Sequence, residues 1–353
     1  MRTVRRSLAF SFAEKYGSYA LGLAGMVILA RLLTPRDFGI FTVGMAVVAL
    51  IEVFRDFGVG NYLVQEREML PVRVRSGFTI TLGISLLCSL GLIAGTGAFA
   101  SFYDEPGLTR LMPLFAANFL LVPFGIPSLA LLRRDMAFDT LAAINLFAAL
   151  VNLGVVVTLA LMGFGFMSLG WATLAGGAAR TAAALLVRPC FWAFRPSLDE
   201  WRRLGAFGAY STATALVNVL HDWLPQLILG RVLGLAAVGI YGRAITLCQL
   251  PDRLVTSALH PVILPALSDK ARRDEPLKTA YLLALSHMSA IHWPLLLYLA
   301  LLAEPIVSLL LGGQWLQVAP LVRIMALATL SLAPAFTPKA LLSMWRVCLI
   351  PAV

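Results

Sequence analysis

The stretch RLLTPRDFGIF, at residues 31–41, returns as RVLGLAAVGIY at residues 231–241. The two copies are offset by 200 residues and share the leading arginine, the leucine at the third position and a Gly-Ile pair. The correspondence continues to Glu52, which has Asp252 at the equivalent place. A repeat at such a long period indicates that the chain is built from two related lobes.

The composition places these lobes in a membrane. Hydrophobic residues make up 59% of the 353 residues and charged residues only 13%, with a mean hydropathy of +0.85. Soluble chains carry about 25% charged residues, so an ordinary soluble enzyme is excluded. A membrane-spanning helix takes roughly 20 apolar residues, so the chain can hold on the order of ten to twelve spans. Apolar runs predict these approximate spans: 17–33, 38–63, 77–100, 111–132, 138–162, 167–187, 206–229, 238–259, 280–303 and 318–337.

The repeat and the spans together predict the architecture. An even number of predicted spans separates the two copies, so both copies cross the membrane in the same direction. We expect an all-α polytopic membrane protein with two parallel-repeat lobes, related by an axis along the membrane normal. The predicted boundaries are a six-helix lobe at 1–187, a linker at 188–205 and a second lobe at 206–353. In the linker, a possible capping box (Ser197 and Glu200) and two tryptophans predict a short helix on the cytoplasmic surface.

The charge pattern predicts the topology. Lysine and arginine total 28 against 18 acidic residues, a formal net charge of +10. The basic residues occupy the amino terminus and every second connection, while the connections between them are nearly bare. By the positive-inside rule the amino terminus and the basic loops are cytoplasmic. Because the basic residues are divided among short loops and form no single patch, nucleic acid is not expected as a partner. Glu14 and Lys15 interrupt the first apolar run, so the amino terminus is expected to be an anchor and not a cleavable signal.

Three segments carry a family resemblance. They are ILARLLTPRDFGIFTVG at 28–44, HPVILPALSDKAR at 260–272 and EPIVSLLLGGQWLQVAPLVRIMAL at 304–327. In this order they resemble the polysaccharide transporter branch of the multidrug/oligosaccharidyl-lipid/polysaccharide superfamily, which contains the Wzx-like flippases for O-antigen and exopolysaccharide. The resemblance runs from about Gly17 to Leu327.

The resemblance implies a function. It implies two six-helix lobes around a central cavity that moves a polyprenyl-diphosphate-linked oligosaccharide across the bacterial inner membrane by alternating access. The implied partners are that lipid-linked substrate, membrane lipids and polysaccharide polymerase or export machinery, with no cofactor. Family members usually carry more spans than this chain. Residues 340–353 are too short to cross a bilayer, so we expect the second lobe to be incomplete.

Ionisable residues inside the predicted spans mark candidate sites, because charges in hydrocarbon normally face a cavity or a partner. On the second span, Glu52, Arg55 and Asp56 share one helical face. They are interpreted either as a cavity lining, in which Arg55 binds diphosphate and an acid takes a coupling proton or cation, or as a self-neutralising ion cluster. Both interpretations stay open.

The remaining charged residues have similar pairs of interpretations. Pro251 is either a hinge beside Asp252 and Arg253 or a packing kink. His221 and Asp222 are either a titrating pair or an internal hydrogen-bonded pair. Arg180 can reach the cytoplasmic interface by snorkelling, which we favour over substrate contact. The resulting candidates for substrate binding are Arg55, Arg243, Arg253 and Arg180, and those for coupling or gating are Glu52, Asp56, Asp222, Asp252 and His221.

Two rival functions have their own sequence signatures. A cation-coupled multidrug exporter of the same superfamily would have a more acidic and aromatic cavity, whereas the mixed charges here favour an anionic head group. A polytopic enzyme of polysaccharide assembly would present acids or histidines on sizeable loops, but the predicted outer loops are short. No GxSxG, HExxH or P-loop motif is present, and His287 and His292 are poorly spaced for a metal, so neither an enzyme nor a metal site is expected.

Overall fold

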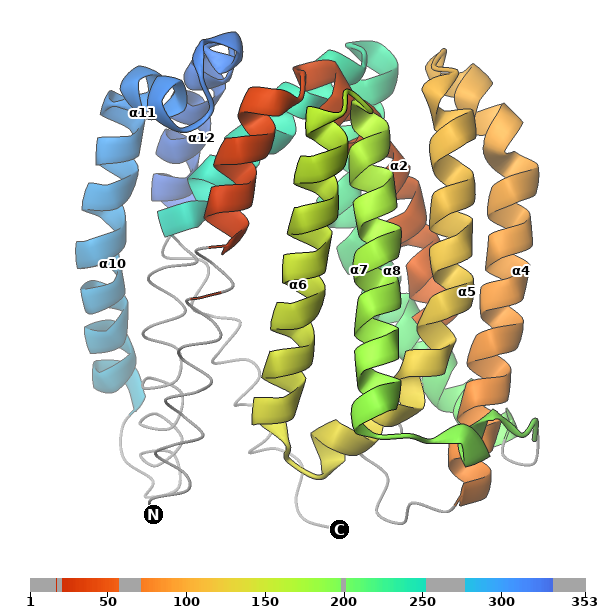
Figure 1. The fold of residues 1–353 in the computed structure, drawn as a ribbon. Coiled ribbons are helices and arrows are strands. Elements are labelled where there is room, and N and C mark those ends of the chain that lie inside the picture. Colours follow the sequence, from red (N-terminus) through yellow and green to blue (C-terminus); the bar gives the residue numbers. More distant parts are fainter. Residues whose placement is uncertain (1–16, 18–20, 57–70, 198–200, 252–276, 333–353) are drawn as a thin grey trace. The chain divides into compact units, whose positions relative to one another are not determined.

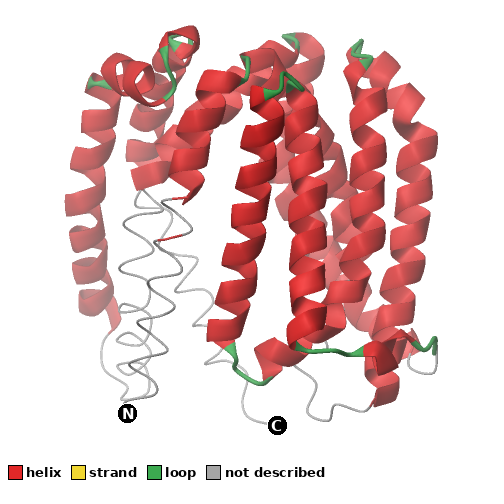
Figure 2. Cartoon of the chain, in the orientation of Figure 1, coloured by secondary structure: helices red, strands yellow, loops and turns green. Residues whose placement is uncertain are grey.

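The computed structural model describes residue 17 and residues 21–56, 71–197, 201–251 and 277–332. Within these ranges the chain is helical apart from short turns, and no strand occurs in them (Figure 2). Contacts between Cα atoms divide the chain into two compact units, Met1–Gly239 and Ile240–Val353.

Each predicted apolar run corresponds to a helix in the described residues. The first is Leu21–Leu32, and a later one covers residues 235–251. Between them lie α2 (Pro35–Asp56), α4 (Pro71–Tyr103), α5 (Gly107–Arg134), α6 (Phe138–Leu161), α7 (Phe166–Val187) and α8 (Trp201–Val232). Several helices begin before their apolar run and end after it, because backbone hydrogen bonding continues into the polar residues that follow.

The helices have the character of membrane spans. Four are individually long and apolar enough to cross a bilayer: Pro35–Arg55, Pro71–Tyr103, Gly107–Arg134 and Phe138–Leu161. Ser286–Leu301 and Ala303–Leu310 meet at an angle of 81° and pass the same test together. The predicted all-α membrane fold is therefore confirmed.

In the first unit, α4 packs along α5, α5 along α7 and α7 along α6, while α2 packs along α8 (Figure 1). Small residues allow these close approaches. A Cβ at Gly125 of α5 would lie 3.2 Å from the hydroxyl of Thr181 on α7, and one at Gly176 of α7 would lie 3.1 Å from the side chain of Asn152 on α6. The amide of Asn152 also donates a hydrogen bond of 2.8 Å to the carbonyl of Ala172, which ties α6 to α7.

The second unit contains α10 (Leu277–Leu301), α11 (Ala303–Leu310), the short 3₁₀ helix η2 (Gly313–Trp315) and α12 (Val318–Leu332). The helix α10 packs along α12. Trp315 is fully buried in the turn that connects α11 to α12. Arg323 of α12 forms an ion pair of 2.9 Å with Glu304 of α11, so this arginine has a local acidic partner.

The linker contains a short helix and is bonded to the start of α4. Its regular part is the short 3₁₀ helix η1 (Phe191–Phe194), and α8 begins at Trp201. The backbone N–H of Ser197 donates to the hydroxyl of Thr79 at 3.0 Å, and its side chain shares a hydrogen bond of 3.2 Å with Ser76. These bonds attach the linker to the start of α4. Glu200, the other half of the predicted capping box, lies outside the described residues, and the predicted lobe boundaries remain a prediction.

Candidate functional site

The basic loops of the first unit gather at one end of its helices. The guanidinium of Arg75 donates to the carbonyl of Trp192 at 3.1 Å. Arg188 forms an ion pair of 2.9 Å with Asp135, and the hydroxyl of Ser128 donates to the carbonyl of Arg188 at 2.9 Å. The connections at the start of α4, the end of α5 and the end of α7 therefore lie together, as the alternation of loop charge predicts.

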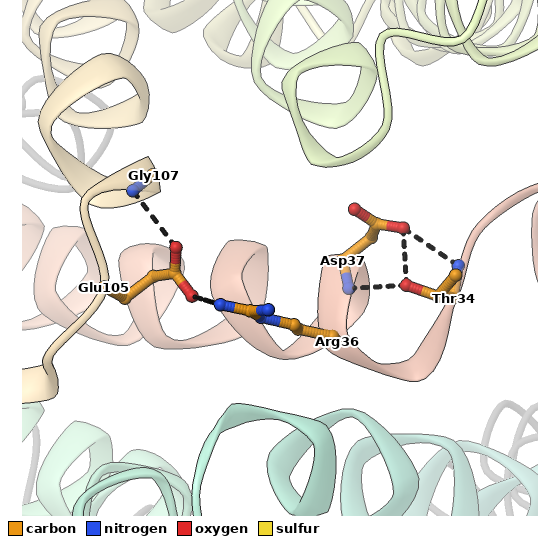
Figure 3. Close-up of polar contacts among 5 residues, drawn as sticks. All are labelled: Thr34, Arg36, Asp37, Glu105 and Gly107. Atoms are coloured by element: carbon orange, nitrogen blue, oxygen red, sulfur yellow. Dashed lines mark hydrogen bonds and ion pairs between the residues drawn. The ribbon is translucent and has the colours of Figure 1, made fainter.

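The sparsely charged loops meet at the opposite ends of the same helices. Figure 3 shows Thr34 and Asp37 at the start of α2. The hydroxyl of Thr34 accepts the backbone N–H of Asp37 at 3.2 Å, while the carboxylate of Asp37 accepts the backbone N–H of Thr34 at 3.0 Å and its hydroxyl at 2.6 Å. This reciprocal arrangement is a capping box, which satisfies backbone donors that the helix itself leaves open.

Asp37 also joins α2 to another helix. Its second carboxylate oxygen accepts the backbone N–H of Phe166, the first residue of α7, at 3.1 Å. The preceding Gly165 has φ of +55°, a conformation that glycine adopts without steric cost. One carboxylate therefore caps the starts of two helices, where the partial positive charges of both helix dipoles stabilise it.

Glu105 forms the second tie at this end. One of its oxygens lies 2.7 Å from the guanidinium of Arg36, and the other accepts the backbone N–H of Gly107 at 3.2 Å (Figure 3). The side chain of Arg36 is 67% exposed, whereas that of Glu105 is 9% exposed. Glu105 therefore acts mainly through the start of α5, because exposed ion pairs contribute little to stability. Together the two ties attach the start of α2 to the starts of α5 and α7.

Arg55 lies inside the first unit, near the end of α2. Its guanidinium is 3.1 Å from the carboxylate of Glu52 and sits over the ring of Phe119 on α5, 5.1 Å from the ring centroid. The side chain of Arg55 is 7% exposed, whereas that of Glu52 is 35% exposed. The pair thus presents its carboxylate to the surroundings and keeps its guanidinium enclosed. The side chain of Asp56 is not described.

The other predicted site residues lie on several helices. Arg180 is exposed on α7, close enough to Arg133 of α5 for the two positive charges to repel. His221 and Asp222 are both exposed on α8, one turn before Pro225. Arg243 is partly buried in the second unit. Asp252 and Arg253 lie outside the described residues.

Several residues that join helices or contact Arg55 in the structure were not predicted from the sequence. The T-x-x-D pattern at Thr34 was a recognisable capping signal, so one role of Asp37 could have been predicted. Its bond to Phe166 could not, because those residues are far apart in the chain. Phe119 has no sequence feature that separates it from any other aromatic residue of an apolar helix.

The sequence is similar to a family model and to known polysaccharide biosynthesis proteins. The family model described as "Polysaccharide biosynthesis protein" matches residues 28–320. The "Lipopolysaccharide biosynthesis protein WzxC" of Escherichia coli K12 is 25% identical over 316 residues, which cover 88% of this chain and 63% of the relative. The "Succinoglycan biosynthesis transport protein ExoT" of Rhizobium meliloti is 27% identical over 339 residues, with 95% and 68% covered.

The fold also has a solved counterpart. An inward-facing multidrug resistance transporter of the MATE family, in the MOP superfamily, superposes with a TM-score of 0.61 at 17% identity, covering 92% of this chain and 83% of the transporter. The chain spans about two thirds of the length of these two curated relatives, 63% and 68%. The family match covers most of the chain, and the chain belongs to the polysaccharide biosynthesis protein family.

Proposed function

We propose that the protein is a flippase that moves a polyprenyl-diphosphate-linked oligosaccharide from the cytoplasmic to the periplasmic leaflet of a bacterial inner membrane. The observation that carries this proposal is the family match over residues 28–320 on a helical fold shared with a transporter. One relative is described as a succinoglycan biosynthesis transport protein, which supports the same class of cargo.

The proposed mechanism is alternating access around a central cavity between two lobes. A diphosphate accepts charge-assisted hydrogen bonds, which are stronger than the bonds that neutral sugar hydroxyls make. Arginine is suited to this task because its planar fork matches phosphate oxygens in pairs. We assign the head group to Arg55, Arg180, Arg243 and Arg253, and coupling or gating to Glu52, Asp56, Asp222, Asp252 and His221.

The Glu52–Arg55 pair deepens this assignment. Since Glu52 is the more exposed member, it is the group that a coupling proton or cation can reach in this conformation. Protonation of Glu52 would weaken its hold on the Arg55 guanidinium 3.1 Å away and free that group for a phosphate. The two halves of the pair thereby provide a link between ion binding and head-group binding.

A labelling experiment tests the proposed orientation. We expect cysteines placed at Arg73, Arg134, Arg203 and Lys270 to react only with reagents that reach the cytoplasm, because the positive-inside rule places all four loops there. Cysteines at Thr34, Asp104 and Phe164, which are exposed at the opposite ends of the helices, provide the matched outer set. Labelling of two or more cytoplasmic positions by an impermeant reagent in intact cells would contradict the orientation.

A translocation experiment tests the proposed cargo. Deletion of the gene in its own host is expected to leave lipid-linked oligosaccharide in the cytoplasmic leaflet, and the gene supplied on a plasmid should restore it to the outer leaflet. Spheroplasts treated with an impermeant glycosidase or periodate measure the fraction that faces outward. An empty plasmid is the control. Unchanged outward exposure in the deletion strain, together with a lower minimum inhibitory concentration for cationic drugs, would favour a multidrug exporter instead.

A further inference from the structure

Two glycines at equivalent positions of the repeat make a reciprocal contact. A Cβ at Gly39 of α2 would overlap the carbonyl oxygen of Leu235 and lie 2.5 Å from its carbonyl carbon. A Cβ at Gly239 would overlap the carbonyl oxygen of Pro35 and lie 2.9 Å from its carbonyl carbon. Pro35 and Leu235 are the first residues of their helices. Each helix therefore places its first carbonyl against the Cα of the other helix's glycine.

This crossing has the symmetry of the repeat. Pro35 corresponds to Leu235 and Gly39 to Gly239 at the same offset of 200 residues. Neither glycine has a positive φ, so backbone conformation does not require glycine at these positions. Space requires it, because any side chain would overlap the backbone of the other helix, which has little freedom to move. The contact explains why the glycine recurs in two segments that otherwise share few residues.

Apolar side chains surround the crossing. Val43 and Val238 are fully buried, and Ile40 and Leu235 belong to the same core cluster. A third glycine, Gly230 of α8, lies against the two valines: its Cβ would be 3.0 Å from Val43 and 3.3 Å from Val238. The crossing is thus dry, and it lies at the sparsely charged end of the unit, beside the capping box of Thr34 and Asp37.

The contacts of α2 differ in kind on its two sides. Toward α7, α2 is held by the carboxylate of Asp37, which accepts the backbone N–H of Phe166, and toward α5 it makes the exposed ion pair of Arg36 with Glu105. Toward Leu235 and Gly239, the contacts that the structure gives for the described residues are close backbone approaches and apolar contacts, which are individually weak. Nearby, α4 meets α8 through a hydrogen bond of 3.3 Å, from the hydroxyl of Tyr103 to the carbonyl of Leu227, and through the guanidinium of Arg231, which lies 5.3 Å from the centroid of the Phe102 ring.

We infer that the Gly39–Gly239 crossing is a dissociable seal that closes the outer end of the transport pathway. This inference rests on the proposed alternating access. When the seal is closed, backbone lies on backbone and Val43 is enclosed. When it opens, the starts of the two repeat-related helices part and Val43 becomes accessible from outside. A side chain at either glycine prevents closure and biases the protein toward the outward-open state.

The test measures closure directly. In full-length protein with Cys88, Cys190, Cys248 and Cys348 replaced by serine, Val43→Cys is labelled in intact cells with a membrane-impermeant maleimide. We expect Gly39→Leu and Gly239→Leu each to raise the labelling rate about tenfold, since each excludes the closed state. Gly39→Ala and Gly239→Ala should give smaller increases and provide a readout if the leucine variants fail to fold. Gly83→Leu on α4 is the matched control, because a Cβ there meets no atom within 4 Å.

The outcomes separate this inference from the proposed function. Folded Gly39 and Gly239 variants that label at the rate of the control would overturn the seal. If the leucine variants do not fold, alanine variants that label at the rate of the control would overturn the seal. Increased labelling in a protein that moves no lipid-linked saccharide would support the seal and refute the proposed cargo.

Discussion

Arg55→Ala is expected to reduce saccharide export to background while the protein still reaches the membrane in normal amount. Export should fall at least about tenfold, since one hydrogen bond to a charged group is worth roughly 1.5–3 kcal/mol. The fold should tolerate the change, because Glu52, the carboxylate that pairs with Arg55, is 35% exposed and is not enclosed in the protein core. Arg55→Lys should keep part of the activity: lysine retains the charge but loses the planar fork.

Two further variants separate a transport role from a structural one. Phe119→Leu removes the ring that lies 5.1 Å from the guanidinium of Arg55 and leaves the charge in place, so export should remain largely intact. If the Glu52–Arg55 pair only joins helices, Arg55→Ala should lower the melting temperature in detergent and Glu52→Gln in the same molecule should restore it. Full export by a stable Arg55→Ala protein would contradict the proposed head-group role.

The helices were predictable because the membrane imposes a simple rule. A segment that crosses hydrocarbon must satisfy its own backbone and carry apolar side chains along its length, so hydropathy marks it directly. The predicted spans at 138–162 and 167–187 accordingly match α6 and α7 to within a residue or so at each end. The linker was less predictable, since the bonds of Ser197 to Thr79 and Ser76 join it to α4, which lies far away in the sequence.

The two copies of the repeat also contact each other in the structure. Their shared glycines, Gly39 and Gly239, mark two positions that contact each other's helices. Sequence comparison identified the correspondence but gave no reason for it, because the reason is a backbone approach between segments 200 residues apart. In this chain the repeated glycines mark a symmetric contact between the two copies.

The candidate site was predictable only in part. The spacing of Glu52 and Arg55 by three residues predicts that they share a helical face, and the 3.1 Å distance between their charged groups confirms it. The enclosure of Arg55 beneath Phe119 could not be predicted, because helical periodicity gives the face of a side chain but not the neighbour that covers it. The ties of Asp37 and Glu105 depend in the same way on how separate helices start side by side.

Asp37→Ala is expected to lower the melting temperature of the detergent-solubilised protein by about 5 °C. The carboxylate accepts hydrogen bonds from Thr34 at 3.0 and 2.6 Å and from Phe166 at 3.1 Å, so alanine leaves donors at the starts of two helices without an acceptor. Loss of a capping residue costs about 1 kcal/mol. The charge-assisted bond to the second helix adds roughly as much again or more.

The Asp37 variants can be ranked by how many of these bonds they keep. Asp37→Asn should fall between wild type and Asp37→Ala, because its single carbonyl oxygen can accept from Thr34 or from Phe166, while its amide nitrogen would face a donor at the other position. Asp139→Ala is the matched control: Asp139 also lies in the first turn of a helix, α6, but is exposed at the surface. A melting temperature of Asp37→Ala equal to that of Asp139→Ala would show that the tie between α2 and α7 contributes nothing to stability. A larger loss of melting temperature in Asp37→Ala than in Asp37→Asn would show that the stability depends on the number of hydrogen bonds that residue 37 accepts.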